Sequence, residues 1–412
     1  MRKYIFLFAV IFSCNLFAQN ILTGYHSQSF ILQSSANASV FPTANFVLGF
    51  PVLSNLNIGV QLPLSLNEVL ENKNDDSLHF SLPLMRSNLV DHNLLSTTFR
   101  NQLFHIGFKV GAQKNVFVYL GDELVVEGGM QFSNKFVDYL TQGNASFLNK
   151  QMDFKSQKIE FSTYNSLYLG AAVKVNEKLE LGFRLKMLRG IANIHTEKLN
   201  IGLYTDSTTN PIYATTLSSD ILIQTSGRGA TDESLDFDPM LNKGFAIDIG
   251  ASYVFTDQLS ASLALNDIGA INWDRSNNTL YATNGEMEFD FTGLNQSSTV
   301  DEDLQAQIEN LTDSLLNKMQ PHESFGEYST KLRPSLYTGL SYELDDKHIF
   351  SALYNRKKVI DKSINAFSLG YQFQLSKSIQ LLASCQTIAG VGAIGTGFVW
   401  NPGLLQMHFV LD

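Results

Sequence analysis

The side chains that could perform chemistry are scattered along this sequence and lack the spacing of a catalytic or metal site. Histidines stand at positions 26, 79, 92, 105, 195, 322, 348 and 408, and none forms the H-x3-H or HExxH spacing of a zinc site. Neither the GxSxG motif of serine hydrolases nor the GxxxxGK[ST] motif of phosphate-binding loops occurs. The sequence therefore predicts that the protein is not an enzyme, and it predicts neither a metal site nor a cofactor.

A second set of polar side chains offers a different chemistry, because its members occupy alternate positions within otherwise apolar stretches. Alternate residues of a strand share one face of the sheet, so these side chains would face one interior. The simplest interpretation is a salt-bridged or hydrated interior that only tolerates charge. The functional alternative is a polar pathway, or a seat for an inserted N-terminal segment. The set comprises Arg184, Lys186, Lys174, His105, Lys109, Asp248 and Asp267.

The elements that position these residues are β-hairpins. Residues 166–188, SLYLGAAVKVNEKLELGFRLKML, place apolar side chains at the odd positions on both sides of the turn 176–178. The even positions include Lys174, Arg184 and Lys186, so one face is apolar and the other polar. The same alternation recurs at 104–120, 245–265, 336–355 and 367–383.

The lengths of the connections indicate how the hairpins are assembled. Alternation over about ten residues is the length of a tilted membrane-spanning strand, and aromatic residues near the turns would form an interfacial girdle. Short turns that alternate with long connections predict one antiparallel transmembrane β-barrel domain over 19–412, whereas a soluble β-sandwich or solenoid is the alternative. The short turns lie at 112–114, 176–178, 256–258, 345–347 and 376–378, and the long connections at 125–165, 189–244, 268–335 and 356–363.

Export and composition agree with this interpretation. Residues 1–18 carry Arg2 and Lys3 before a short apolar run, which predicts a signal peptide cleaved after Ala18. A lipoprotein anchored at Cys14 is the alternative. A formal charge of −10 argues against nucleic acid as a partner. The predicted location is the cell outer membrane.

Two features of the longest connection, 268–335, are distinctive. Residues 301–319 predict an amphipathic helix at the extracellular mouth that either caps the barrel, gates a ligand or docks a partner. Near the start of the connection, Trp273 is expected to anchor at the membrane interface, and Gly269 to relieve crowding. The apolar face of the predicted helix consists of Leu304, Ile308, Leu311 and Leu315.

Three stretches resemble a family of outer-membrane barrels from Bacteroidota whose function is uncharacterised: FVLGFPVLSNLNIGV (46–60), GFRLKMLRGIANIHTEKLNIGLYT (182–205) and ALNDIGAINWD (264–274). That family is similar to the FadL-like barrels, which include fatty-acid and hydrocarbon channels and the PorV barrel of the type IX secretion system. The resemblance implies about 14 strands (range 12–16) and an N-terminal segment, 19–44, that can enter the lumen. The sequence departs from the FadL-like pattern at Asn37-Ala38-Ser39, where those proteins carry Asn-Pro-Ala.

The resemblance implies two candidate functions. The first is a FadL-like channel for small or hydrophobic molecules, and the second is a non-enzymatic interaction barrel of the type IX secretion or surface-assembly machinery. The implied partners are outer-membrane lipid, the barrel-assembly machinery, and either a hydrophobic small molecule or secretion-system proteins. Counting strands from the turn 376–378 gives an odd number, which predicts that a closing strand is missing or that 404–411 lies outside the wall.

Overall fold

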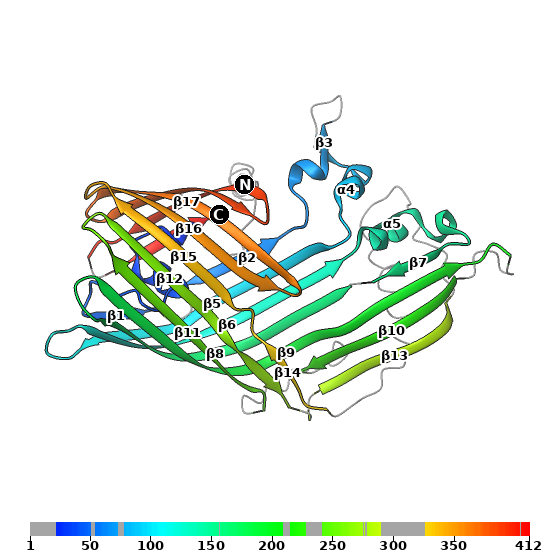
Figure 1. The fold of residues 1–412 in the computed structure, drawn as a ribbon, viewed down its shortest axis with the longest axis horizontal. Helices are drawn as coiled ribbons and strands as arrows, with labels where there is room; N and C mark the ends of the chain where they lie inside the picture. The colour runs from blue at the N-terminus through cyan, green and yellow to red at the C-terminus, as the bar shows by residue number, and fades with distance from the viewer. Residues whose placement is uncertain are drawn as a thin grey trace, which may run out of the picture.

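The described part of the chain forms one large antiparallel sheet that curls into a β-barrel (Figure 1). The computed structural model describes residues 22–50, 54–72, 78–155, 157–208, 215–227, 241–274, 276, 278–289, 326–403 and 405–412. In order around the wall, the strands are β1 (Phe46–Gly49) and β2 (Leu56–Gln61), β5 (Asn93–Val110), β6 (Val116–Phe132), β8 (Lys158–Lys174), β9 (Leu179–Thr205), β11 (Lys243–Val254), β12 (Leu259–Trp273), β15 (Ser335–Glu343), β16 (His348–Val359), β17 (Lys362–Ser376), β18 (Ile379–Ile388), β19 (Val391–Trp400) and β20 (Met407–Leu411).

The two edges of this wall are β1 with β2 and β20. Both β1 and β2 pair with β5, so they count as one position, and the wall has thirteen positions among the described residues. No pairing joins β20 to β1 or β2 in that part of the chain. Met407–Leu411 pairs with β19, so the predicted alternative in which 404–411 lies outside the wall is wrong for these residues.

The faces predicted from the alternation are confirmed. On β9 the side chains of Leu181, Phe183 and Leu185 are 43%, 47% and 49% exposed, whereas Arg184 and Lys186 between them are buried. The sheet therefore turns its apolar face outward and its polar face inward. This is the reverse of a soluble barrel, in which the apolar face forms the core.

Side-chain caps close the short turns at one end of the barrel. The Asn176 carboxamide oxygen accepts hydrogen bonds from the amides of Lys178 and Leu179, and the Asp345 carboxylate accepts from those of Lys347 and His348. Asn and Asp favour such turns because the side chain replaces a backbone acceptor. This end of the wall is called the short-turn end below.

At the opposite end the strands are longer than the sequence predicts. The expected connections 125–165 and 189–244 contain parts of β6, β8 and β9, and β9 alone has 27 residues. The expected connection 356–363 is almost entirely strand, because β16 ends at Val359 and β17 begins at Lys362. Beyond the barrel, the extension of β9 pairs with β10 (Thr215–Ser226), which pairs with β13 (Asn278–Phe289); β7 (Gln151–Phe154) also pairs with β9 (Figure 1). The expected connection 268–335 contains β13 and β14 (Tyr328–Lys331).

Short helices lie inside the barrel and at its long-strand end. Inside are α2 (Leu22–Tyr25) and α3 (Phe30–Ala36); outside are η1 (Leu66–Glu68), the hairpin β3 (Leu70–Asn72) with β4 (Leu78–Phe80), α4 (Leu82–Asn88), α5 (Asn134–Gln142) and η2 (Asn144–Phe147). Among the helices of the described ranges, none has the length and apolar character to cross a membrane. The predicted helix 301–319, with Leu304, Ile308, Leu311 and Leu315, falls outside the described residues, as does the predicted signal peptide.

A β-bulge in β12 corrects the prediction for Trp273. Before the bulge the odd residues of β12 point outward, as Leu263 does at 52% exposed. The ladder with β11 shifts by one residue near Asp267, after which the even residue Ile268 points outward at 43% exposed. A shift of one residue moves every following side chain to the other face. Trp273 is therefore fully buried inside the barrel, where its indole N–H donates to Thr330 at 2.8 Å, and it is not an interface anchor.

Two apolar clusters fill the long-strand half of the barrel interior. One contains Leu22, Leu94, Leu353, Val359, Ile360, Ile364, Ala366 and Ile388. The other contains Val125, Tyr164, Leu188, Ala246, Ile271, Trp273 and Leu332. Both lie beyond the charged residues of the barrel centre. Two smaller clusters, one of Phe117, Tyr119 and Tyr168 and one of Leu32, Leu382 and Val399, lie elsewhere in the interior.

The outward position of Leu185 gives a test of the face assignment. Replacing Leu185 with Arg places a charge on the apolar outer surface, which should cost about 2–4 kcal/mol near a bilayer midplane. Urea unfolding in phospholipid vesicles, followed by tryptophan fluorescence, measures this cost. Gln113→Arg on an exposed short turn is the matched control and should change the unfolding free energy little. Equal stability of the two variants would overturn the assignment.

Candidate functional site

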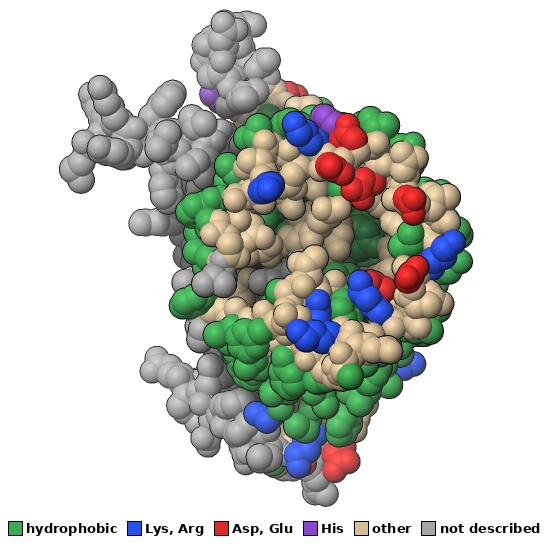
Figure 2. All heavy atoms as spheres, turned by 90° about the vertical axis from the view of Figure 1, so that its left-hand side faces the viewer, with side chains coloured by type: hydrophobic (Ala, Val, Ile, Leu, Met, Phe, Trp, Pro, Cys, Tyr) green, Lys and Arg blue, Asp and Glu red, His purple; other side chains and the backbone are tan. Residues whose placement is uncertain are grey.

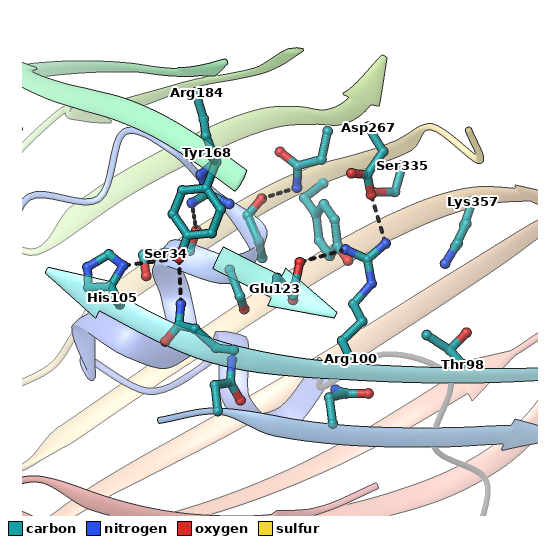
Figure 3. Close-up of a pocket in the computed structure, with 17 residues that line it drawn as sticks. Ser34, Thr98, Arg100, His105, Glu123, Tyr168, Arg184, Asp267, Ser335 and Lys357 are labelled. Carbon is teal, nitrogen blue, oxygen red and sulfur yellow. Dashed lines mark hydrogen bonds and ion pairs between the residues drawn. The ribbon is translucent and has the colours of Figure 1, made fainter. Parts of the chain in front are cut away.

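Eight charged side chains meet inside the barrel and form what we call the ionic belt. Four are cationic and four are anionic, so their formal charges cancel. They come from six different strands, β5, β6, β9, β11, β12 and β16, and the close-up view shows several of them around one small cavity (Figure 3). The members are Arg100, Arg184, Lys186, Lys357, Glu123, Glu127, Asp248 and Asp267.

Lys186 joins the two aspartates of the belt. Its Nζ lies 2.8 Å from Asp248 Oδ2 and 2.6 Å from Asp267 Oδ1, and all three side chains are almost fully buried. A buried charge is tolerated only where partners of the opposite sign replace its hydration shell. Lys186 therefore bridges two buried carboxylates, each of which has one further cationic partner, Arg184 for Asp248 and Arg100 for Asp267.

Arg100 carries the belt across the lumen. Its Nη2 lies 2.9 Å from Asp267 Oδ2 on the far wall and 2.8 Å from Glu127 Oε1 on the neighbouring strand. Glu127 Oε1 in turn lies 2.9 Å from Lys357 Nζ on β16. The belt thus ties together strands that share no backbone pairing (Figure 3).

The bulge in β12 aims Asp267 into this belt. Asp267 has φ 60°, a left-handed conformation that Asp adopts more readily than most residues, and its amide donates to Asp248 Oδ1 at 2.8 Å. Asn266 and Asp267 both point inward because the extra residue interrupts the alternation. The left-handed backbone conformation of the bulge and an ion pair of the belt therefore occur at the same residue, Asp267.

The belt also holds the end of α3. Arg184 Nη2 donates to the carbonyl of Ser34 at 2.6 Å, and Asn266 Nδ2 donates to the carbonyl of Ala36 at 2.7 Å. The last carbonyls of a helix have no partner within the helix, and the negative end of its dipole attracts a cation. Arg184 therefore binds α3 with one nitrogen and, at 3.3 Å, Asp248 with another.

Residues 22–45, which we call the inner segment, are bound at several further positions by hydroxyl and amide groups of the wall, and at Thr43 by Lys109 Nζ at 2.9 Å. Asp412 and Ser384 bind Thr23; Ser262 binds Tyr25; Ser368 and Ser351 bind His26 at 2.7 and 2.6 Å; and Ser252 binds Ser39 at 2.8 Å. Apart from Asp412 and Lys109, these wall partners are neutral. The inner segment is thus held largely by exchangeable polar contacts, with Leu22 and Leu32 adding apolar packing.

Glycines on the inner face make room for the inner segment. A Cβ atom at Gly182 would collide with the backbone of Ala38, and one at Gly370 with the imidazole of His26. Glycine within a strand often marks a close approach of another chain segment. The remaining glycines of this seat are Gly250 against Asn37, Gly339 against Tyr25 and Gly395 against Thr23.

The other predicted interior residues lie nearer the short-turn end. His105 is buried, with its Nδ1 3.1 Å from the hydroxyl of Tyr168. Lys109 and Lys174 lie on either side of the Phe41 ring, 5.0 and 4.9 Å from its centroid, and Lys174 also pairs with Glu180 at 3.2 Å. The structure thus places Arg184, Lys186, Asp248 and Asp267 in one cluster and the other three residues outside it.

Half of the ionic belt was not predicted from the sequence. Arg100 stands in a stretch without clear alternation, Glu123 and Glu127 stand at and beyond the expected end of a strand, and Lys357 stands in an expected connection. The alternation along β6 could have identified two of these residues. Glu123 and Glu127 stand at odd positions, as does Tyr119, whose side chain is buried. The wall glycines that contact the inner segment could not be identified from the sequence, because a glycine within a strand can have several structural reasons.

Hollows inside the described part of the barrel include two with polar linings. One, of about 80 Å³, lies between the end of α3 and the belt and is lined by Arg100, Arg184, Glu123, Asp267 and Lys357 (Figure 3). It has room for a few water molecules. The other, of about 320 Å³, opens at the short-turn end, which is visibly hollowed (Figure 2). Across the described ranges, no group of His, Cys, Asp and Glu is arranged to hold a metal ion.

The comparison with protein families places the chain. A family described as being of unknown function, DUF5723, matches residues 39–412. This chain belongs to the DUF5723 family. The match spans every described wall strand and part of the inner segment. The ionic belt and the wall glycines that contact the inner segment therefore lie within the matched region. No curated protein matches the chain.

Solved structures with a similar course of the chain are outer-membrane transport proteins. The toluene transporter TodX of Pseudomonas putida is 9% identical, with a TM-score of 0.35, over 80% of this chain and 72% of that one. The deltaS2 mutant of TodX, a monoaromatic hydrocarbon channel, is 11% identical, with a TM-score of 0.40, over 90% and 85%. A Pseudomonas aeruginosa FadL homologue is 12% identical, with a TM-score of 0.31, over 86% and 74%. At these values the likeness carries no conclusion about the function of this chain.

The first prediction from this site concerns the belt. Lys186→Met leaves Asp248 and Asp267 each with one partner fewer, and breaking a buried ion pair costs about 3–5 kcal/mol. The control is Lys198→Met, which removes an exposed pair with Asp220 at 3.6 Å and should cost less than about 1 kcal/mol. Urea unfolding in vesicles measures both, and equal losses would contradict a structural role for the belt.

The second prediction concerns the dependence of the inner segment on pH. Burial lowers the pKa of the His26 imidazole to about 4, so the docked segment keeps this ring neutral. A released segment has an ordinary histidine pKa near 6.5 and binds the proton more tightly. Docking is therefore fully stable above about pH 6.5 and weakens as the pH falls toward 4, by roughly 3 kcal/mol in total.

A spin label at the exposed position of Ser35, in a Cys385→Ser background, reports this release as increased mobility. His26→Gln keeps a hydrogen-bonding side chain but cannot titrate, so its label mobility should change less between pH 7 and pH 4.5. Asp412 titrates in both proteins, so the difference between them isolates His26. Identical pH profiles would show that His26 does not control docking.

Proposed function

We propose that this protein is an outer-membrane channel for small molecules in which the inner segment is a removable plug. In this proposal the chain is exported by the predicted signal peptide and performs no enzymatic reaction. The plug, residues 22–45, closes the passage in the arrangement described above. The following observations support the proposal.

The outer surface supports a membrane location. Large apolar side chains that are 40% exposed or more recur on the outward face, including Phe245, Ile249, Leu369, Ile394 and Phe409. Aromatic pairs lie outward near the short turns, such as Tyr253 with Phe255 at 4.9 Å and Phe350 with Tyr371 at 5.1 Å. An apolar band with aromatic residues at its border is what a bilayer requires of a barrel.

The single observation that carries the proposal is the chemistry of the plug seat. Most contacts between plug and wall are hydrogen bonds between neutral groups, such as Ser39 with Ser252 and Thr23 with Ser384. Each such bond contributes only about 0.5–1.5 kcal/mol, because water replaces it when the partners separate. Glycines give the plug space without interlocking side chains. A seat of this kind favours release and return over permanent packing.

The arrangement described here corresponds to a closed channel. The plug occupies the lumen beside the ionic belt, and beyond the belt the interior is filled by the cluster around Trp273 and Leu188. A passage therefore requires that the plug and the belt rearrange. Arg184 binds both α3 and Asp248, so release of α3 takes one hydrogen-bond partner from this member of the belt.

The test uses a disulfide that locks the plug. Ser39→Cys with Ser252→Cys, in a Cys385→Ser background, joins positions whose hydroxyl oxygens lie 2.8 Å apart. Solute-driven swelling of proteoliposomes should be lowest for the oxidised double variant, return to the parent level on reduction, and rise when residues 22–44 are deleted. Each single cysteine variant is the control for the substitutions themselves.

Swelling that ignores both the lock and the deletion would reject the channel and favour the second candidate, an interaction barrel. One observation supports that candidate: β9 continues beyond the barrel and carries β10 and β13 with it, which presents a broad sheet away from the wall (Figure 1). In that case the locked and deleted variants should still capture the same partner proteins as the parent from native membranes.

A further inference from the structure

The hollow at the short-turn end has a wall chemistry that differs from the rest of the interior. It measures about 320 Å³, which falls at the lower end of the range for pockets that hold small ligands. Figure 2 looks into this end of the molecule and shows the opening. The plug forms one side of the hollow through Tyr25, His26, Gln28 and Gln33, and the strands β11, β12, β15 and β16 form the other.

Serines line the strand side in a regular row. Ser260 on β12 pairs in register with Ser341 on β15, and Ser341 pairs with Ser351 on β16. Side chains at paired positions on one face lie about 5 Å apart, so the three hydroxyls form a continuous polar strip across three strands. Ser351 uses its hydroxyl to bind His26 at 2.6 Å, and Ser262 similarly binds Tyr25.

Ser260 and Ser341 are different, because neither forms a side-chain hydrogen bond to the described residues of the plug. Both line the hollow and are half-buried. Gln28 binds the wall through its backbone amide, which donates to Gln372 Oε1 at 2.9 Å, and its side chain also lines the hollow. The hollow therefore offers hydroxyl and amide groups beyond those that the plug uses.

Charge is confined to the rim of the hollow. Glu177, Glu180, Asp257 and Glu343 line it there with Lys178, and Lys174 pairs with Glu180. This acidic excess repels anions before they enter. Deeper in, the lining side chains are uncharged when His26 is neutral, so a charged ligand would lose its hydration without gaining a counter-charge. An apolar ligand would leave the serine hydroxyls unpaired.

We propose that the hollow at the short-turn end binds an uncharged, polyhydroxylated solute of about the size of a mono- or disaccharide through Ser260, Ser341 and the side chain of Gln28. This deepens the proposed function by naming a solute class for the same lumen, and its binding step also stands without transport. The ligand donates and accepts hydrogen bonds along the serine strip and enters from the short-turn end, because the plug closes the other side.

The apolar surface of the molecule is separate from this site. A hollow of about 790 Å³ lined by Leu340, Phe367, Leu369 and Ile394 lies on the outward face of β15 to β19. Hydrocarbon chains of the surrounding lipid fit that surface. The hollow at the short-turn end and the outward surface thus offer different chemistries, and a solute in the hollow meets the polar one.

Calorimetric titration of the purified full chain tests the proposal, in an amine-oxide detergent that carries no sugar head group. Maltose is the neutral probe, gluconate the anionic probe and toluene the apolar probe. Maltose should bind saturably in the millimolar range, gluconate should bind about tenfold more weakly or not at all, and toluene should not compete with maltose.

Ser260→Leu with Ser341→Leu should weaken maltose binding by about tenfold, because two hydrogen bonds are lost and their partners are left unpaired. Ser378→Leu, on the turn after β17, is the matched control and should bind as the parent does. The mobility of a spin label at Ser35 should stay unchanged in all of these variants, which shows that the plug is still docked.

Two results would overturn the proposal: no saturable heat with maltose in the parent, or equal maltose affinity in the parent and the double serine variant. Toluene binding in place of maltose would also reject the proposed solute class. If swelling still responded to the disulfide lock of the plug, the channel proposal would nevertheless stand. Conversely, maltose binding could depend on the serines while swelling is unaffected by the disulfide lock. That result would support the binding site and reject the channel.

Discussion

The architecture of this protein depends on keeping eight ionised side chains together inside a wall whose outer face is apolar. A charge on the outer face of such a barrel is costly, so the charged residues of the strands must share the interior. There each needs a partner, and the alternation of cations and carboxylates from Arg184 through Lys186 and Arg100 to Lys357 provides one for each. Because these partners come from opposite walls, the same pairs fix the distance between the walls.

The belt also decides where the N-terminal segment can lie. Arg184 binds Asp248 through one nitrogen and donates through another to the carbonyl of Ser34 at the end of α3. The glycines of the inner face then determine how close the segment approaches the wall. Packing and electrostatics therefore agree on one position for α3. The small number of charged contacts that hold it is consistent with a segment that can leave.

The sequence predicted the faces of the strands more completely than their lengths. Period-two alternation placed Arg184, Lys186 and Asp248 on the inner face because the pattern is set by the pleat, which is a local property. Asp267 was also predicted to face inward, but it does so because of the bulge in β12 and not because of the alternation. The belt as a unit could not be predicted, since Arg100 meets Asp267 across the lumen at a sequence distance of 167 residues. Trp273 was misplaced for a similar reason. A single bulge, at which the Asp267 amide donates to the Asp248 carboxylate of the neighbouring strand, reversed the alternation for the residues that follow it.

The length of β9 has a mechanical consequence. At about 3.3 Å per residue its 27 residues measure about 90 Å, whereas a tilted strand needs only about 9–11 residues to cross a bilayer. The ladders on β9 pass from the barrel wall into the extension with register shifts near Gly190 and Thr196, so a pull on the far tip along the strand axis loads many hydrogen bonds in parallel as shear. A flexible loop of the same length would stretch before it transmitted force. The extension is therefore a stiff lever that is continuous with the strand bearing Arg184 and Lys186. A force applied at its tip is transmitted along β9 to these two residues of the ionic belt.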